Sequence, residues 1–154
     1  MIVIRNYKES DVRALWDIRF RTIREVNIKD YSKEQVEAWA PASFDIKDWS
    51  EKLSRLSPFI AEIDGTIVGY ADLQVDGLID HFFCHYQYQG QGVGRALMEH
   101  LFKVGTSKGI YCYYSAVSIT AKPFYEKFGF SVSREQLVEV RGQIFKNFLM
   151  TRSL

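Results

Sequence analysis

The sequence predicts a single α/β (α+β) domain over residues 1–154, with a mixed, mostly antiparallel sheet and a central parallel βαβ unit flanked by helices. Three observations predict this fold. Apolar residues recur at helical spacing in the first third of the chain, alternating strand patterns with short turns follow, and a glycine-rich segment then joins a strand pattern to a helix pattern. A length of 154 residues with 47% hydrophobic residues suits one compact core, and no linker-like or low-complexity segment divides the chain.

The first third of the chain predicts one strand and three helices. Residues 2–6 alternate like a strand, and Ser10 offers an N-cap to a helix over residues 11–25. The segment Ser32-Lys33-Glu34-Gln35 matches a capping box, in which the Ser and Gln side chains satisfy backbone N–H groups at the start of a short second helix. A third helix is expected over residues 45–55.

Strand periodicity begins at Pro58. Two strands over residues 59–63 and 67–75 flank the turn Asp64-Gly65, and this arrangement predicts an antiparallel hairpin. A second turn then leads into a strand over residues 78–85.

The remainder of the chain predicts the parallel unit and the closing strands. A helix that begins at the glycine-rich segment is followed by a strand over residues 110–117, so strand, helix and strand form a βαβ unit. A helix over residues 121–128, ended by Gly129, and two strands over residues 130–140 and 143–151 complete the sheet.

The glycine-rich segment is Gln89-Gly90-Gln91-Gly92-Val93-Gly94. Glycines at this density let the backbone N–H groups of a turn point together at a helix start, which is the arrangement that binds a pyrophosphate. A dinucleotide fingerprint needs a third glycine where the chain has Arg95, and a triphosphate loop needs Gly-Lys followed by Ser or Thr. The loop therefore predicts a phosphate-bearing cofactor outside these two classes.

Two segments resemble signatures of the GNAT N-acetyltransferase superfamily. Gln89, Gly92 and Gly94 match its acyl-coenzyme A loop, and residues 121–130 (Ala-Lys-Pro-Phe-Tyr-Glu-Lys-Phe-Gly-Phe) resemble a second family motif. The resemblance covers nearly the whole chain and implies the GNAT acyl-CoA N-acyltransferase fold. It also implies that acetyl-CoA is the co-substrate, whose acetyl group passes to a primary amine by direct attack in a ternary complex.

The resemblance implies where the coenzyme binds. Backbone N–H groups on the strand before the loop are expected to stabilise the oxyanion, and the pantetheine arm is expected to lie between this strand and the next. Ser118 stands where the family most often has Asn, so it is expected either to contact this arm or to start a helix. The residues expected at the coenzyme are Phe83, Cys84, His85, Gln89, Gly90, Gln91, Gly92, Val93, Gly94, Arg95, Ser118 and Tyr125.

Acetyl transfer needs a proton donor for the departing thiolate and a base for the attacking amine. Tyr125 is the expected acid, because a phenol is protonated at neutral pH and the family uses the tyrosine of this motif in that way. Asp80 and His81 are the candidate bases on the strand before the loop, and they point to opposite faces of that strand. Asp72 on the preceding strand and a water molecule are the alternatives.

Charge and composition limit the partners. The formal net charge of +1 predicts no nucleic-acid partner, and because no apolar run reaches transmembrane length, a cytoplasmic location without a membrane partner is expected. Cys84 and Cys112 are expected in strands as buried reduced thiols without a disulfide. No metal is expected, because His81 and His85 share a strand face opposite Cys84.

The sequence leaves the acceptor open. The segment before the first hairpin is expected to form the acceptor site, where Arg19, Arg24, Tyr31 and Trp39 supply charge or an aromatic wall. No acidic groove suited to lysine-rich peptides is visible, so a small-molecule amine is favoured over a protein or peptide. A noncatalytic acyl-CoA-binding sensor or scaffold is the alternative from another class, and the resemblance makes a homodimer possible.

Overall fold

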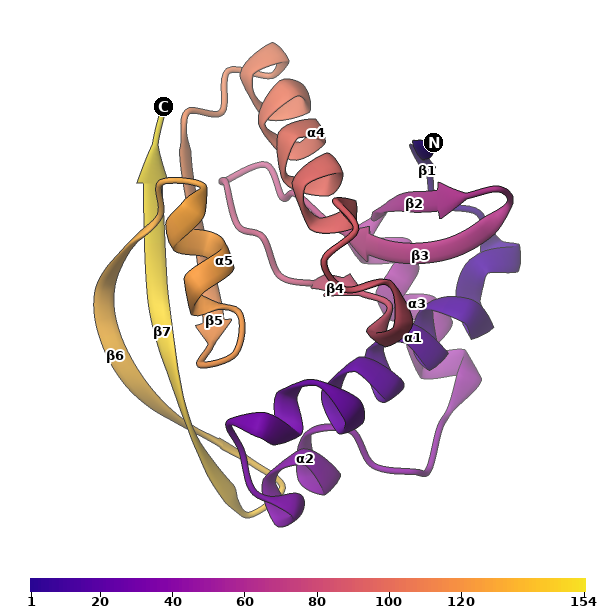
Figure 1. Cartoon of the computed structure of the whole chain (residues 1–154), viewed down its shortest axis with the longest axis vertical. Coiled ribbons are helices and arrows are strands. Elements are labelled where there is room, and N and C mark those ends of the chain that lie inside the picture. The colour runs from indigo at the N-terminus through magenta and orange to yellow at the C-terminus, as the bar shows by residue number, and fades with distance from the viewer.

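The computed structural model describes all 154 residues, which form two antiparallel sheets that lean apart on either side of helix α4 (Figure 1). The strands are β1 (Ile2–Asn6), β2 (Phe59–Ile63), β3 (Thr66–Ala71), β4 (Phe82–Cys84), β5 (Cys112–Ser118), β6 (Ser131–Val140) and β7 (Gln143–Ser153). The helices are α1 (Val12–Glu25), α2 (Lys33–Trp39), α3 (Ile46–Leu56), α4 (Val93–Ser107) and α5 (Lys122–Lys127). No helix has the length and apolar character needed to cross a membrane.

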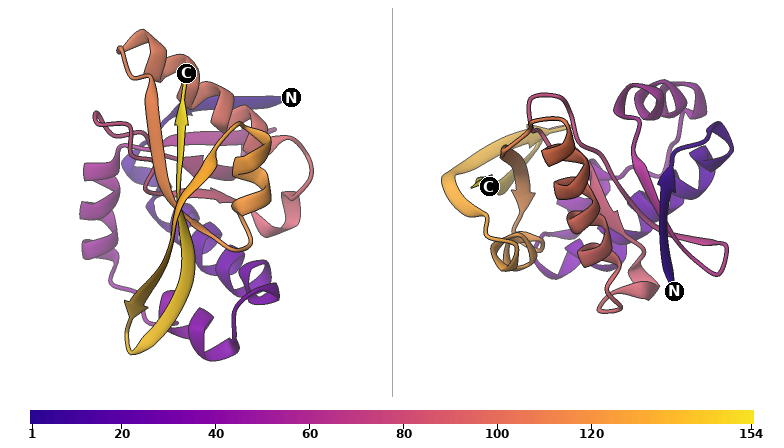
Figure 2. Two further views of the ribbon diagram at one scale, coloured as in Figure 1. Left: turned by 90° about the vertical axis from the view of Figure 1, so that its left-hand side faces the viewer. Right: turned by 90° about the horizontal axis from the view of Figure 1, so that it is seen from above.

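The N-terminal sheet has the strand order β1-β2-β3-β4 and the C-terminal sheet the order β5-β7-β6, and all neighbouring strands are antiparallel. The predicted βαβ unit is present as β4-α4-β5, but its parallel contact is a single bridge between Leu78 and Tyr114. At this bridge the Ile79 N–H donates to the Tyr114 carbonyl at 2.9 Å. Beyond it the two sheets diverge, as Figure 2 shows, and one edge of β4 has no partner strand.

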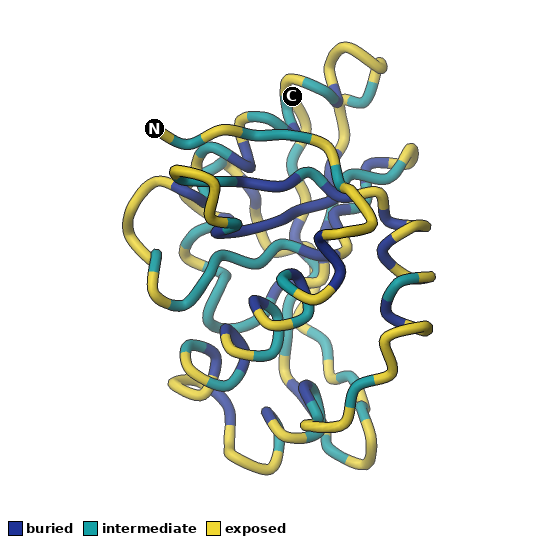
Figure 3. Tube along the Cα trace, turned by 90° about the vertical axis from the view of Figure 1, so that its right-hand side faces the viewer, coloured by how far each residue is buried: buried dark blue, intermediate teal, exposed yellow.

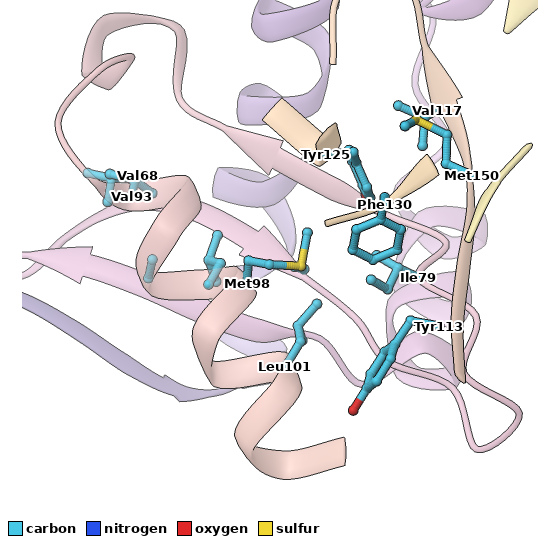
Figure 4. Packing of buried hydrophobic residues seen from close by; sticks show 13 residues of the cluster. Val68, Ile79, Val93, Met98, Leu101, Tyr113, Val117, Tyr125, Phe130 and Met150 are labelled. Carbon is cyan, nitrogen blue, oxygen red and sulfur yellow. The ribbon is translucent and has the colours of Figure 1, made fainter. Parts of the chain in front are cut away.

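Helix α4 packs its apolar face against both sheets and joins them at their common base. Leu97, Met98 and Leu101 are fully buried on this face. Met98 and Leu101 point toward Ile79 and Phe130 in the close view of this core (Figure 4). Burying three such side chains contributes roughly 5 to 9 kcal/mol of transfer free energy. Because both sheets pack on this one helix, it holds them in a fixed relation to each other.

Helices α1 and α3 cover the opposite face of the N-terminal sheet. Buried and exposed positions alternate along the helices, as expected for amphipathic segments (Figure 3). The buried Trp49 of α3 donates its indole N–H to the Val12 carbonyl at 2.9 Å and so joins α3 to the start of α1. Neighbouring residues of β2 pack on opposite faces of the sheet, because Ile60 faces α1 and α3 while Ala61 faces α4.

The β6–β7 hairpin extends past α5 and closes onto α2 (Figure 1). The Tyr31 hydroxyl donates to the Lys146 carbonyl at 2.6 Å, and the Gln35 side chain donates to the Ile144 carbonyl at 2.7 Å. Tyr31 also accepts the Ile119 N–H at 2.9 Å. These bonds bring the N-terminal helices and the C-terminal sheet together at the end of the molecule opposite α4.

The start of α1 differs from the prediction, whereas that of α2 agrees with it. Ser10 is not the N-cap, because residues 9–11 form a 3-10 turn and the Asp11 carboxylate accepts the Lys8 N–H at 2.8 Å. At α2 the capping box is confirmed, since Ser32 Oγ accepts the backbone N–H of the third helical residue and that residue's side chain accepts the Ser32 N–H.

Strands β3 and β4 are both shorter than the strands predicted over residues 67–75 and 78–85. The physical reason is the buried carboxylate of Asp72. It accepts the backbone N–H groups of Asp80 and His81 at 3.0 and 2.6 Å, so these two groups bond a side chain and not the backbone of the neighbouring strand. The chain between them therefore forms a loop that a side chain fixes.

Candidate active site

The two sheets enclose a cleft of about 670 Å³. Its walls come from α1, β4, the glycine loop, the first turn of α4, β5, α5 and the β6–β7 hairpin. In the half between α1, α2 and the hairpin, the rings of Tyr31, Trp39 and Phe145 pack against each other with centroids 5.7 to 5.9 Å apart. The cleft therefore joins the predicted coenzyme loop to the predicted acceptor side.

The free edge of β4 supplies a backbone donor to the cleft. In an antiparallel ladder, alternate residues direct their N–H and C=O groups toward the partner strand. The His85 N–H donates to the Val68 carbonyl at 2.7 Å, and the same alternation directs the Phe83 N–H toward Tyr70. The Cys84 N–H therefore faces the gap. Of the three predicted oxyanion residues, only Cys84 has a free N–H, because Phe83 and His85 use theirs within the sheet.

The Cys84 carbonyl is held from two sides. Thr22 of α1 donates its hydroxyl to it at 2.8 Å, and the Gln89 side chain donates to it at 2.9 Å. Gln89 thereby fastens the glycine loop to β4 with the side chain that the family pattern requires. Burial raises the pKa of the Cys84 thiol to about 12. The thiol is therefore protonated at neutral pH and fills space rather than acting as a nucleophile.

The glycine loop has the geometry of an anion site. Gly90 and Gly92 adopt φ angles of 74° and 85°, which a residue with a side chain rarely adopts. Gly92 is the N-cap of α4, and no side chain bonds the first N–H groups of this helix. The Val93 side chain is buried in the core, so this residue offers its backbone N–H, while the Gln91 side chain is exposed. Free N–H groups at a helix start suit a diphosphate.

Gly94 and Arg95 take part in packing contacts that the loop motif did not predict. A Cβ atom at Gly94 would lie 2.7 Å from Cε1 of Phe124, so glycine here lets α5 approach α4 closely. Arg95 is exposed, pairs with Glu99 at 3.5 Å and lies 5.1 Å from the centre of the Phe128 ring. Both residues line the cleft, and Arg95 would have to leave its pairing with Glu99 to bind an anion.

Tyr125 of α5 is 3% exposed and lines the cleft. Its hydroxyl lies 3.4 Å from Ser115 Oγ, which donates to the Ile79 carbonyl at 2.7 Å. Burial raises the pKa of Tyr125, so the phenol keeps its proton at neutral pH and can donate it in a hydrogen bond. Tyr125 can therefore donate a hydrogen bond inside the cleft, and its role as the acid stays a prediction.

The wall of the cleft that the C-terminal part of the chain forms contains two polar atoms without a hydrogen-bond partner in the protein. Ser118 Oγ accepts the Ala121 N–H at 3.0 Å, so Ser118 does start the turn that leads into α5, and Asn27 donates to it at 3.4 Å. Thr120 Oγ1 and Asn147 Oδ1 are buried in the cleft wall without a hydrogen-bond partner. Buried polar atoms of this kind are normally satisfied, so they suit a ligand with complementary groups.

His81 does not have the chemistry of the predicted base. Its side chain is 6% exposed, and Nδ1 lies 3.1 Å from the hydroxyl of Tyr70. Burial raises the pKa of Tyr70, so the phenol donates, Nδ1 accepts, and we assign the imidazole proton to Nε2. Burial, with the positive charges of Arg19 and Lys52, lowers the pKa of His81 to about 3. Neither ring nitrogen is therefore available to take a proton at neutral pH.

The two aspartates near His81 have different positions. Asp80 is exposed and is the only carboxylate that lines the cleft. Asp72 is fully buried, outside the cleft, and its oxygens accept the two backbone N–H groups of residues 80 and 81 and the Gln74 side chain at 2.5 Å. Burial raises the pKa of Asp72 to about 6. Asp72 therefore positions the backbone, and Asp80 is the carboxylate that an acceptor can reach.

The cleft contains residues that sequence patterns identified and others that they missed. Arg19, Tyr31 and Trp39 line the cleft, whereas Arg24 donates to the Ala40 carbonyl at 3.0 and 2.7 Å and does not line it. Thr22 and Ser115 belong to no motif. The partners of their hydroxyl groups lie 62 and 36 residues away in the sequence. The sequence gives a signal only for Thr22, because helical spacing puts it on the buried face of α1.

The two cysteines differ from the expectation of buried thiols, and His85 packs against an aromatic ring. Both cysteines are free, but neither is fully buried as expected, because Cys112 is exposed and Cys84 is half-buried. His85 stacks on Tyr86 with ring centres 5.0 Å apart, and its Nδ1 accepts the Gln87 N–H at 3.0 Å. No group of three or more His, Cys, Asp or Glu side chains is arranged to hold a metal ion.

The chain matches known proteins over most of its length. Residues 27–151 match the family model of the acetyltransferase (GNAT) domain. The uncharacterized N-acetyltransferase YafP of Escherichia coli (strain K12) is 36% identical over 149 residues, covering 97% of this chain and 94% of that protein. A GCN5-related N-acetyltransferase from Rhodopseudomonas palustris has a TM-score of 0.94 at 32% identity, covering 99% of this chain and 95% of that one. PaiA N-acetyltransferase from Thermoplasma acidophilum, in complex with coenzyme A, has a TM-score of 0.80 at 19% identity, with coverage of 100% and 99%.

Proposed function

Because the chain belongs to the GNAT acetyltransferase family, we propose that it transfers the acetyl group of acetyl-CoA to a primary amine of a small molecule by direct attack in a ternary complex. The observation that carries this proposal is the unpaired edge of β4, whose Cys84 N–H faces a cleft with an uncapped helix start on one side and the buried Tyr125 phenol on the other. These groups match the needs of a diphosphate, a developing oxyanion and a departing thiolate.

Backbone groups of this chain suit the coenzyme. The free N–H groups at the start of α4, around Gly92, would hold its diphosphate. The open edge of β4 would pair with the amides of the pantetheine arm as an added strand does. The Cys84 N–H would then donate to the thioester oxygen as it becomes an oxyanion, without reorganisation of the protein.

Two side chains would handle the protons. In the transfer, the amine nitrogen forms a bond to the acetyl carbon while the bond from that carbon to sulfur breaks. Tyr125 would donate a hydrogen bond to the departing thiolate, and the raised pKa of the phenol keeps it in its protonated form. Asp80, as the carboxylate that lines the cleft, would accept the proton of the amine directly or through water.

The closed end of the cleft supports a small acceptor. The β6–β7 hairpin is bound to the α2 region through Tyr31 and Gln35, and the Arg141 guanidinium at its turn donates to the Ala38 carbonyl at 2.8 Å. An extended peptide needs an open groove along which its backbone can pass. A small amine needs only the aromatic-walled end of the cleft.

The decisive variant is Tyr125→Phe, which removes one oxygen and keeps the ring. We expect kcat for acetyl transfer, measured by thiol release with a panel of amines, to fall roughly 100-fold or more. Coenzyme A affinity, measured by calorimetry, should change little, because the phenol is assigned to the departing sulfur. Tyr111→Phe is the matched control, since Tyr111 is 53% exposed and lies outside the cleft.

Two results would contradict the proposal at different points. If Tyr125→Phe turns over like the wild type, Tyr125 has no part in the chemical step. If no amine in the panel causes thiol release above background while coenzyme A still raises the melting temperature, the chain is a noncatalytic acyl-CoA-binding module.

A further inference from the structure

A charged donor faces the acceptor half of the cleft without a counter-ion. The Arg19 guanidinium projects from α1, and its one hydrogen bond is a long one of 3.4 Å to the Trp39 carbonyl. It forms no ion pair, and its carbon lies 6.0 Å from the centre of the Phe83 ring. Burial lowers the pKa of Arg19, and the charge of Asp80, which forms no ion pair with Arg19, does not offset the loss of hydration. An anion would supply the missing partner.

The Nε2–H of His81 is a second donor in the same cleft. The side chain is 6% exposed, Nδ1 is engaged by the Tyr70 hydroxyl, and Nε2 has no protein partner. Its neutral form is stable because burial, together with the nearby charges of Arg19 and Lys52, disfavours a positive charge on the ring. A guanidinium and a neutral N–H together form a donor set that matches the oxygens of a carboxylate or a phosphate.

Further positive charge adjoins this pair. A neighbouring depression shares Arg19 with the cleft and adds Lys52 and Arg141, neither of which forms an ion pair. The carboxylates of the depression are Asp45 and Asp48, and Asp45 is occupied in capping α3. The depression beside the cleft therefore has three cations against two carboxylates, and this excess of positive charge favours an anion.

The coenzyme diphosphate does not account for these donors. His81 precedes β4 and the glycine loop follows it, so the two sites are separated by a three-residue strand, which spans about 10 Å at 3.3 Å per residue. On α1, Thr22 contacts the Cys84 carbonyl near the loop, and Arg19 lies about one helical turn earlier, toward His81. The donors therefore belong to the acceptor.

We propose that the acceptor is an amine that also carries an anionic group, a carboxylate or a phosphate, and that this group binds between Arg19 and His81. The inference rests on the proposed acetyl transfer, because it names the substrate class of that site. Asp80 faces the ammonium of the same molecule, so the cleft wall has a negative and a positive group for the two charges of the acceptor. Amines without an anionic group cannot form an ion pair with the Arg19 guanidinium.

The test compares matched amines with wild-type protein and with Arg19→Gln. One pair is β-alanine and β-alaninamide, the other is O-phosphoethanolamine and ethanolamine, and kcat/KM is measured at saturating acetyl-CoA. We expect the wild type to prefer an anionic member at least tenfold, and Arg19→Gln to bring the ratio close to one. Which pair shows the preference distinguishes a carboxylate from a phosphate. Arg13→Gln, on the exposed face of the same helix, should keep the wild-type ratio.

Binding data separate this inference from acetyl transfer itself. Calorimetry with the coenzyme A complex should show saturable binding of O-phosphoethanolamine or β-alanine that weakens at least tenfold in Arg19→Gln. If this binding is present but no amine is acetylated, the anionic subsite is supported and the catalytic proposal fails. If neither pair shows a preference in turnover or binding, or if the preference persists in Arg19→Gln, the inference is overturned.

Discussion

The neutral, buried imidazole of His81 predicts how the stability of the fold depends on pH. An unperturbed histidine has a pKa of about 6.5, and in the folded protein the pKa of His81 is lowered to about 3. Above pH 6.5 the ring is neutral in both states and does not contribute to the pH dependence. Below pH 6.5 the unfolded chain binds a proton that the folded chain excludes, so the free energy of unfolding falls as pH falls.

The size of the effect follows from the two pKa values. They differ by about 3.5, and each pH unit between them removes about 1.36 kcal/mol, so the complete loss between pH 6.5 and pH 3 is about 5 kcal/mol. The variant His81→Asn removes the titration and keeps an acceptor for the Tyr70 hydroxyl, because Asn Oδ1 replaces Nδ1. Burial raises the pKa of Asp72, which changes stability in the opposite sense between about pH 4 and pH 6, but Asp72 is present in both proteins and its contribution cancels in the difference.

Urea denaturation of both proteins at pH 7.5, 6.5, 5.5 and 4.5 measures this difference. We expect the free energy of unfolding of the wild type, minus that of His81→Asn, to change little above pH 7 and to fall by about 2.7 kcal/mol between pH 7.5 and pH 4.5. A difference that stays constant over the whole range would refute the reasoning. So would a His81 ring proton signal in NMR spectra that titrates with a midpoint near 6.5.

Two further predictions test the packing around the glycine loop and the state of the thiols. Gly94→Ala should lower the free energy of unfolding, measured in urea, by about 1 to 3 kcal/mol, because the new Cβ would lie 2.7 Å from Phe124. In a protein that already carries Phe124→Leu, the same substitution should cost less. An equal loss with Phe124 and with Leu at position 124 would contradict the contact. Iodoacetamide at pH 8 should modify the exposed Cys112 and leave Cys84 unmodified, because burial raises the pKa of the Cys84 thiol to about 12. Peptide mass mapping measures the two modifications. Equal modification of both cysteines would contradict the raised pKa of Cys84.

Local signals in the chain predicted the elements that depend on local chemistry. The capping box at Ser32 and the turn at Asp64-Gly65, whose residues have φ angles of 49° and 80°, depend on neighbouring residues alone. The ends of β3 and β4 were wrong, because they depend on Asp72, whose side chain bonds a backbone eight to nine residues away. Periodicity has no information about such a bond.

The same distinction holds for the site. The sequence by itself determined the glycine loop, the tyrosine of the second motif and the family, because these features are short runs of residue types. The tertiary structure decided which of the predicted donors has a free N–H group and which candidate carboxylate lines the cleft. The Cys84 N–H is open because two sheets diverge, and His81 is neutral because it is buried near two cations from other elements. Hydrogen-bond partners, burial and charge come from segments distant in the chain, and these determine the chemistry that each side chain can perform.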